Sequence, residues 1–283
     1  MKRLTIIGGV LALIAIGIVV WQVLRPSEEA SAPIEAIPLD IEATEPPVVP
    51  TPAPTEVPPT ATAVPTTEPT EEVAVEEPTE EPTEEPTEAP TPTLEPTAAP
   101  TVGAGLQIYE INPEDSGVRF ELDEDLAGVR NTVVGRTDQV AAQLAVDYTD
   151  LSTAQLGVLQ INARTLMTDN SFRNRAINNQ ILDTGAYEFI TFTPTVINGL
   201  PDNVNVGDTV TFTIVGDLTI RDITTEVTFD VEATAVSATQ ISGMASTIVT
   251  RQAYDLVIPS VPQVANVEEE VELYIDFVAN AVP

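Results

Sequence analysis

The side chains that could do chemistry in this chain are carboxylates, arginines and hydroxyls, because its 283 residues include neither Cys nor His. This composition excludes thiolate nucleophiles, disulfides, Cys/His zinc sites and imidazole general bases. Asp217 and Asp222 are paired acids, but nothing around them marks a catalytic couple. The sequence also has no phosphate-binding loop, nucleophile elbow or dinucleotide fingerprint. We therefore predict a protein that is not an enzyme and has no cofactor; a carboxylate-based hydrolase is the least favoured alternative.

The acidic runs at 123–125 and 268–270 could attract calcium. Neither run has the loop spacing of a known calcium site, so we interpret both as solvated turns and predict no metal site.

Cations are scarce after Arg25, where the chain has eight Arg and no Lys. The formal net charge of −33 argues against nucleic acid as a partner, since a polyanion is bound by clustered cations. Because cations are scarce, four of the arginines are notable, and one of them could meet a polar head group, although salt bridges to the many carboxylates are the favoured interpretation: Arg173, Arg175, Arg221 and Arg251.

Residues 1–26 are predicted to form a signal-anchor transmembrane helix. Lys2 and Arg3 precede an uncharged apolar run from Leu4 to Leu24, whose 21 residues would extend roughly 30 Å as a helix, the thickness of a bilayer core. The basic start places the N-terminus in the cytoplasm and the rest of the chain outside the cell membrane. A cleaved signal peptide, with Ala30-Ser31-Ala32 as its cleavage site, and a buried core helix are the alternatives.

Residues 27–105 are predicted to be a disordered, acidic, Pro/Thr-rich linker. Of the 25 prolines, 19 lie between Pro26 and Pro100, and a Glu-Glu-Pro-Thr unit repeats between Glu76 and Pro90. Proline and like charges extend such a chain, so it would act as a spacer. A peptide ligand for a proline-reading domain and an O-glycosylated stalk are the alternatives.

Residues 106–283 are predicted to form an all-β domain. Apolar and polar side chains alternate along 209–214, 227–234 and 272–277, as expected of antiparallel strands with one buried face. Further strands are predicted at 106–111, 117–122, 132–136, 143–147, 155–162, 188–193 and 241–250, with turns at 112–113, 198–202 and 206–208. Asp169 or Ser171 is expected to cap one short inserted helix.

About nine short strands with one helix are compatible with a barrel or a sandwich. Only a barrel of about eight strands leaves an interior for a small ligand. The candidate cavity-lining residues, for which ordinary core packing is the alternative, are Val118, Phe120, Phe172, Ile177, Phe189, Phe192, Phe212, Ile214, Phe229 and Phe277.

Four segments occur in a recognisable order: 109–120; 173–177 with 181–183 and 187–192; 216–224 running into 227–229; and Arg251 and Tyr254 with 258–262 and 266–267. Together they resemble the YceI-like family of exported lipocalin-like barrels, over residues of about 106–281. The resemblance implies an antiparallel lipocalin-like β-barrel that encloses an isoprenoid or similar lipid chain, a fold for which no catalysis is established as such. Asp115 and Arg221 stand where family members often carry His, so no ligand contact by those His residues can be assumed here.

The sequence therefore predicts a membrane-tethered, extracytoplasmic β-barrel that binds a lipid or isoprenoid. Its partners are this ligand and, through the N-terminal helix, the membrane. Arg173, Arg221 and Arg251 are the candidate contacts for the ligand's head group. The alternative is a structural or adhesive surface module with a packed core and no small ligand.

Overall fold

The computed structural model describes residues 26–39, 41 and 105–282. The predicted anchor helix and most of the predicted linker fall outside these residues. Within the described part of the chain, no helix is long and apolar enough to span a bilayer. Residues 26–39 and the domain that starts at Gly105 belong to one compact unit.

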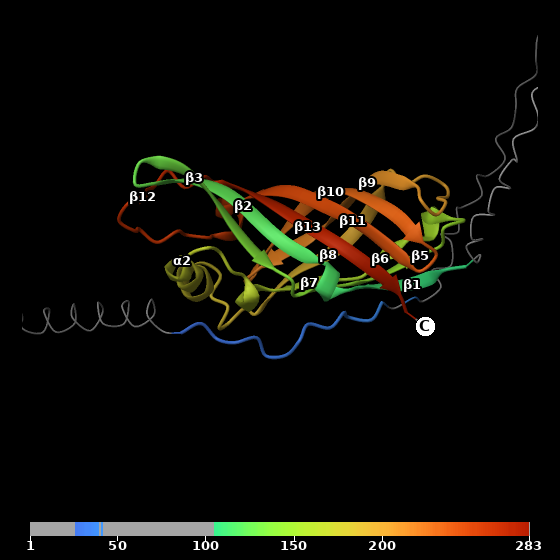
Figure 1. Cartoon of the computed structure of the whole chain (residues 1–283), viewed down its shortest axis with the longest axis horizontal. Helices are drawn as coiled ribbons and strands as arrows, with labels where there is room; N and C mark the ends of the chain where they lie inside the picture. The colour runs from blue at the N-terminus through green and yellow to red at the C-terminus, as the bar shows by residue number, and fades with distance from the viewer. Residues whose placement is uncertain (1–25, 40, 42–104, 283) are drawn as a thin grey trace, which may run out of the picture. The chain divides into compact units, whose positions relative to one another are not determined.

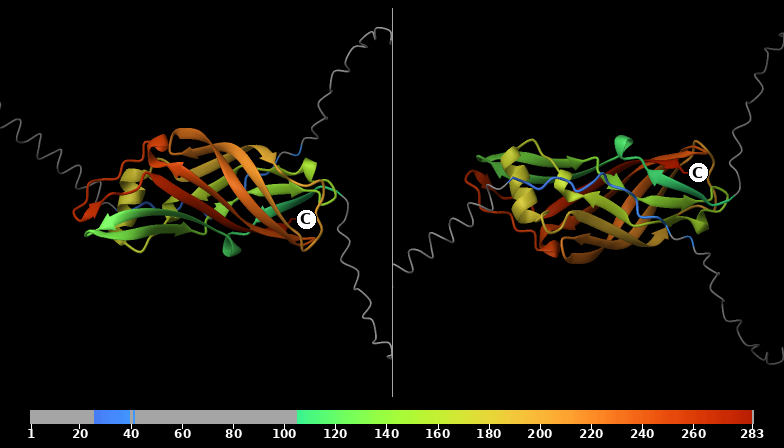
Figure 2. Two further views of the ribbon diagram at one scale, coloured as in Figure 1. Left: turned by 90° about the horizontal axis from the view of Figure 1, so that it is seen from above. Right: turned by 90° about the horizontal axis from the view of Figure 1, so that it is seen from below.

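The domain is all-β, with one short helix (Figures 1 and 2). Every predicted strand is present at least in part, and several run longer than predicted, but the strand predicted at 155–162 is divided into two short strands by residues 157 and 158. The strands are β1 (Gln107–Ile111), β2 (Gly117–Leu126), β3 (Val129–Thr137), β4 (Val140–Ala141), β5 (Gln143–Val146), β6 (Gln155–Leu156), β7 (Leu159–Asn162), β8 (Phe189–Asn198), β9 (Thr209–Ile220), β10 (Ile223–Ser237), β11 (Gln240–Thr250), β12 (Val264–Ala265) and β13 (Glu270–Ala281).

The strands form a single sheet in which every pairing is antiparallel. Its main order is β4-β7-β8-β9-β10-β11-β13-β1-β5-β6, and β2 adds to β13 and carries β3 and β12. Residues 272–276 of β13 pair with β2, whereas residues 279–281 of the same strand pair with β1. β13 therefore pairs with β11 along one edge, and with β2 and then β1 along the other.

The sheet curls back on itself through the stretch 140–146. Val140 and Ala141 pair with β7, and Gln143 to Val146 pair with β1. Between them, the Ile111 amide donates to the Ala142 carbonyl at 3.0 Å. The curled antiparallel sheet with one short helix fits a lipocalin-like fold, and the alternative of two stacked sheets is wrong.

Alternation along each strand decides which side chains enter the interior. In β10, Phe229, Val231 and Ala233 are buried, whereas Asp230 and Glu232 between them are exposed. The buried apolar side chains of all the long strands belong to one continuous core.

The one helix, α2 (Ser171–Ala176), continues into a π-helical turn, η4 (Ile177–Ile181), and lies at one end of the sheet (Figure 1). Its N-cap is Asn170, whose side-chain oxygen accepts from the amides of Phe172 and Arg173. The predicted caps are therefore wrong by one residue. Asp169 instead forms an ion pair with Arg173 at 2.5 Å, across one helical turn.

Residues 26–39, here called the strap, run along the outside of the sheet (Figure 2, blue). The backbone amide and hydroxyl of Ser31 donate to the Glu188 carboxylate at 2.8 and 2.7 Å. Glu28 forms an ion pair with Arg164, and the Leu39 amide donates to the Gln143 side chain at 2.9 Å. The first residues of the predicted linker are thus held against the domain.

Candidate functional site

Two apolar cavities lie inside the curled sheet. The larger one, called the helix-side cavity, has a volume of about 450 Å³ and lies against α2. The smaller one, called the far cavity, has a volume of about 140 Å³ and is surrounded by the inward faces of β8 to β11 and β13. Both volumes are large enough to hold apolar groups rather than a single trapped water.

The two cavities follow each other along the same strands. On β8, Ile190 lines the helix-side cavity and Phe192, the next inward residue, lines the far cavity. On β13 the change comes between Leu273 and Ile275. Since inward residues alternate at about 7 Å, only one layer of side chains separates the cavities.

Val118 and Leu218 belong to this dividing layer. Val118 pairs with Ile275, and Leu218 lies on β9 between Ile214 of the far cavity and Ile220 of the helix-side cavity. Both side chains are buried, and neither lines a cavity. Beside this layer, the rings of Phe192 and Phe229 meet edge to face at 5.0 Å.

Phenylalanine rings lie against the wall of the sheet where a neighbouring strand has glycine. The Phe120 ring covers Gly135 on β3, its direct cross-strand partner, and the Phe277 ring covers Gly243 on β11. The Phe192 ring covers Gly216 in the same way. Without a Cβ on these glycines, the rings need not project into the interior.

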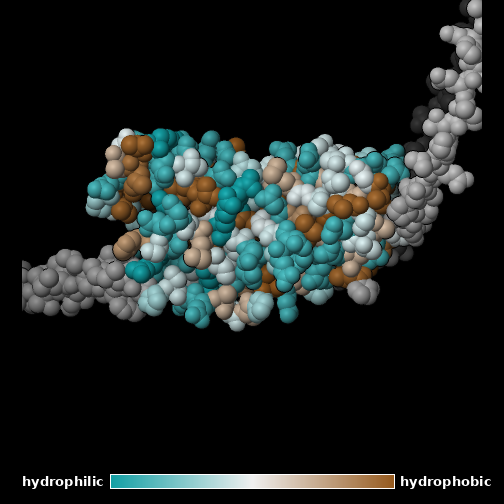
Figure 3. Space-filling model, in the orientation of Figure 1, coloured by the Kyte–Doolittle hydropathy of each residue, from teal (hydrophilic) through white to brown (hydrophobic). Residues whose placement is uncertain are grey.

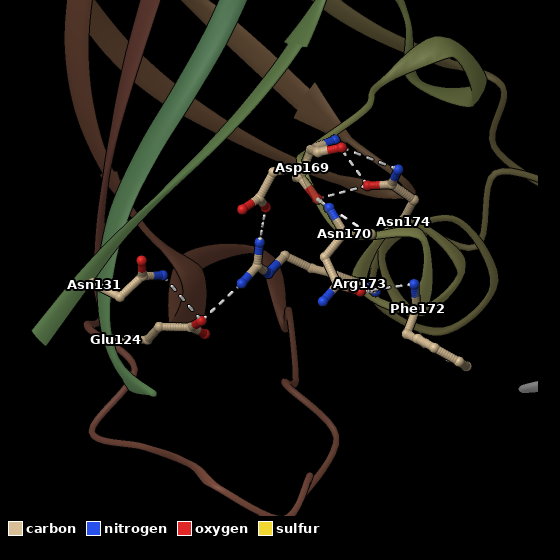
Figure 4. Close-up of polar contacts among 8 residues, drawn as sticks. Glu124, Asn131, Asp169, Asn170, Phe172, Arg173 and Asn174 are labelled. Atoms are coloured by element: carbon tan, nitrogen blue, oxygen red, sulfur yellow. Dashed lines mark hydrogen bonds and ion pairs between the residues drawn. The ribbon is translucent and has the colours of Figure 1, made fainter. Parts of the chain in front are cut away.

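A buried ion pair supplies the polar part of the helix-side cavity (Figure 4). Glu124 and Arg173 both line this cavity, and they meet at 2.9 Å with side chains only 7% and 18% exposed. Asn131 adds a hydrogen bond to the same Glu124 oxygen, and Asp169 binds the other end of the guanidinium. The pair leaves a charged, hydrogen-bonding spot beside an otherwise apolar surface.

The loop that follows β11 covers part of the helix-side cavity. Its lining side chains are Leu256, Ile258, Pro259, Val261, Pro262, Val264 and Val267. Arg251 holds the two ends of the loop together, because its guanidinium donates to the carbonyls of Val267 and Glu268 and pairs with Glu269. β12, within the loop, pairs with β2 at Leu126.

The opposite end of the interior is closed by two stacked tyrosines. The rings of Tyr109 and Tyr148 lie 6.2 Å apart, and their hydroxyls donate to the carbonyls of Ala238 and Ser237. Burial raises the pKa of both hydroxyls above their usual value. They therefore stay neutral and act as hydrogen-bond donors across the physiological range.

Eight of the ten predicted lining residues line a cavity. Phe120, Phe172 and Ile177 line the helix-side cavity. The other five line the far cavity: Phe192, Phe212, Ile214, Phe229 and Phe277. Val118 lies in the dividing layer, and Phe189 is 38% exposed because its neighbour Ile190 occupies the inward position on β8. The expectation for Phe189 is thus corrected.

The predicted arginines separate into two groups. Arg173 and Arg251 line the helix-side cavity, whereas Arg221 does not. Arg221 adopts a left-handed backbone conformation in the tight turn between β9 and β10, with its guanidinium near the carbonyls of Ile181 and Asp255. Arg175 lies over the Phe172 ring at 5.6 Å.

The prediction of a solvated turn at 123–125 is wrong, because this run lies within β2 and Glu124 is buried. Sequence reasoning therefore missed Glu124, and it also missed the covering loop. Glu124 lies on the inward face of β2, and its position two residues after Leu122 is the signal that could have separated it from the solvated Asp123 and Asp125. Those two aspartates do interact with solvent-exposed Arg130. Within the described residues, no cluster of acidic side chains is arranged to hold a metal ion.

One protein family matches this chain. The model of the YceI-like domain matches residues 109–279. No curated protein matches the chain.

Several solved structures are similar to this chain. BcnA of Burkholderia cenocepacia is 18% identical, with a TM-score of 0.48, covering 60% of this chain and 99% of that one. A polyisoprenoid binding domain from Saccharophagus degradans is 16% identical, with a TM-score of 0.49 and coverage of 62% and 98%. The YceI protein of Campylobacter jejuni is 16% identical, with a TM-score of 0.43 and coverage of 53% and 85%.

Proposed function

Because the chain belongs to the YceI-like domain family, we propose that it binds a lipid with a long apolar chain, of the isoprenoid type, inside its curled sheet. The single observation that carries the proposal is the helix-side cavity, which combines about 450 Å³ of apolar space with one buried ion pair. An adhesive module with a packed core would not need such a space.

The lining supports an apolar chain as the main recognition element. Its walls are Leu, Ile, Val and Phe side chains from β2, α2 and the covering loop. Each methylene that leaves water for this surface contributes about 0.8 kcal/mol, or roughly a fourfold gain in affinity. A chain long enough to pass the dividing layer at Leu218 would also reach the far cavity.

The Glu124–Arg173 pair supports contact with a polar head group. Arg173 already binds two carboxylates, Glu124 and Asp169, so a head group that accepts hydrogen bonds would replace or share these contacts. Arg251 is committed to the ends of the covering loop, and we assign it a positioning role. Arg173 is therefore the proposed head-group contact.

We further propose that the protein acts without catalysis, outside the cell membrane, tethered by its N-terminal apolar run. The sequence supports this arrangement, because Leu4 to Leu24 is uncharged and is preceded by Lys2 and Arg3. The absence of Cys and His from the whole chain supports a binding role over a catalytic one.

Extraction of the purified full-length protein with organic solvent, followed by mass spectrometry, tests the proposal. We expect a long-chain lipid at about one molecule per protein, from mass balance for a single site. Ala176→Trp places an indole in the helix-side cavity and should abolish recovery of the lipid. Ala186→Trp, at an exposed position outside the cavity, is the size-matched control. An extract without lipid from the wild-type protein refutes the proposal.

A further inference from the structure

Exposed apolar side chains gather around the mouth of the helix-side cavity. Val257, Phe172 and Val129 are 74%, 73% and 68% exposed, the highest values among the large apolar residues that the structure describes. Figure 3 shows apolar surface at the end of the domain that carries the tip of β2 and β3. Single exposed apolar residues are ordinary, but a group around a cavity mouth marks an interaction surface.

These residues belong to three different elements that meet at the mouth. Phe172 itself lines the cavity, and Val257 stands between Leu256 and Ile258, which also line it. Val129 pairs with Leu126, a further lining residue, at the tip of the β2–β3 hairpin. Val129, Phe172 and Val257 therefore border the same cavity, and together they are here called the apolar rim.

The strap shows which partner this rim meets. Pro26 and Ser27, at its start, share a surface groove with Ser171, Asn174 and Arg175 of α2. Ion pairing and hydrogen bonds at Arg164 and Glu188 hold the next residues of the strap in place. The start of the strap is thus fixed beside the helix that forms part of the rim.

The apolar run of the sequence ends immediately before this point. Only Arg25 separates Leu24 from Pro26, and two residues of chain reach at most about 7 Å. Where Leu4 to Leu24 enters a bilayer, the α2 end of the domain must therefore lie against that bilayer. The opposite end, closed by Tyr109 and Tyr148, points away from it.

The charges around the rim decide how it meets the membrane. Arg173 is paired with Glu124 and Asp169, Arg130 with Asp123 and Glu268, and Arg251 with Glu269. Three of the arginines around the mouth are thus matched by acids, whereas Arg175 lies over the Phe172 ring, and the chain as a whole is strongly acidic. Attraction to anionic lipids therefore contributes little, and insertion of apolar side chains supplies most of the contact.

We propose that the apolar rim is a membrane-docking surface, held against the bilayer by the strap, through which a lipid passes directly between the bilayer and the helix-side cavity. This inference rests on the proposed function and adds the route by which the ligand enters. A lipid that follows this route keeps its chain away from water throughout the transfer. Its partner is the surface of a zwitterionic bilayer.

The absence of native cysteine allows a single label to test the docking. Full-length protein carrying Val257→Cys is labelled with a nitrobenzoxadiazole fluorophore and reconstituted into phosphatidylcholine vesicles that contain nitroxide-labelled lipid. Val236→Cys, 43% exposed near the far end of β10, is the matched control. We expect several-fold stronger quenching at position 257 than at position 236. Equal quenching at the two positions, or none at position 257, overturns the proposal.

Lipid extraction from the same labelled protein, taken before reconstitution into vesicles, distinguishes failure of the docking surface from failure of the binding function. Bound lipid with no quenching at position 257 overturns the docking surface and leaves the binding function standing. Quenching at position 257 without bound lipid supports the docking surface and refutes the binding function. Self-association through the rim would instead shield the label at position 257 from water, and so raise its fluorescence, in detergent as well as in vesicles. That result also overturns the proposal.

Discussion

Phenylalanine rings that lie over glycines help to keep the interior open. At Gly135, the atoms that a Cβ would meet are all on the Phe120 ring, at 2.1 to 2.9 Å. At Gly216 and Gly243 a Cβ would also meet backbone oxygens, of Thr193 and Glu232. Gly135 is therefore the position at which an added methyl group displaces a ring without displacing a strand.

Gly135→Ala should push the Phe120 ring into the helix-side cavity. Because the ring has empty space to enter, we expect the free energy of unfolding to fall by only about 1 kcal/mol. The displaced ring removes space for about two methylenes of ligand, which lowers affinity on the order of tenfold. Titration with a prenyl alcohol and denaturant unfolding measure the two effects.

Gly117→Ala is the control for this substitution. A Cβ there would meet only the Thr137 carbonyl at 3.6 Å, an ordinary contact. We expect unchanged affinity for this variant. Unchanged affinity for Gly135→Ala as well would show that the Phe120 ring does not border the ligand.

Single residues also show how far sequence reasoning reaches. Alternation identified Phe212, Phe229 and Phe277 as inward, because period two is a direct property of a strand. It could not say that Glu124 is buried, since a carboxylate enters an interior only when a partner such as Arg173 comes from elsewhere in the chain. That partner lies 49 positions further along the sequence.

Among the elements, the strap is the one whose observed structure differs most from the structure that its composition predicts. Its prolines and acids are typical of a disordered linker, yet Ile34 is buried and Glu188 of the domain binds Ser31. These contacts come from residues that are distant in sequence, so no local pattern predicts them. The strands, by contrast, were predictable because their signal is local.

Docking of the strap should depend on the ionisation of Glu188. Burial alone would raise the pKa of this carboxyl, but hydrogen bonds from Ser31 and Asn162 and the charge of Arg164 hold it below its ordinary value of 4.5. A lowered pKa means that docking is complete above the ordinary value and is lost as pH falls through the lowered one. The strap should therefore release in acid.

A spin label on Ala32→Cys, an exposed strap position, reports this release by its mobility. We expect slow motion at neutral pH and fast motion well below pH 4.5, the ordinary value for this carboxyl. Glu188→Gln should give fast motion at both pH values. Two results would contradict the assigned role of Glu188: a label mobility that is the same at neutral and acidic pH, or a label mobility at neutral pH that Glu188→Gln leaves unchanged.

At the scale of the whole molecule, the sequence predicted one curled sheet with an inserted helix but not the space inside it. Space depends on whether inward side chains meet across the interior, and this is decided by ring orientations such as that of Phe120 over Gly135. The covering loop at 256–267 has no period that marks it as part of the site. The position of the mouth beside α2 likewise appears only in three dimensions.

The helix-side cavity, the Glu124–Arg173 ion pair and the strap lie at the same end of the domain. The cavity supplies the space, the Glu124–Arg173 pair supplies polarity at its mouth, and the strap fixes the start of the domain beside that mouth. A ligand chain would run from this pair along the inward faces of β8 and β13, toward Leu218. Substitutions along these inward faces should therefore change the affinity for the ligand chain.

The most direct test of the central claim is an experimental structure of the full-length protein isolated from its native membrane. We expect continuous elongated density that begins beside Arg173, fills the helix-side cavity and reaches the layer formed by Val118 and Leu218. A helix-side cavity filled by the protein's own side chains, or occupied only by water, would contradict the account.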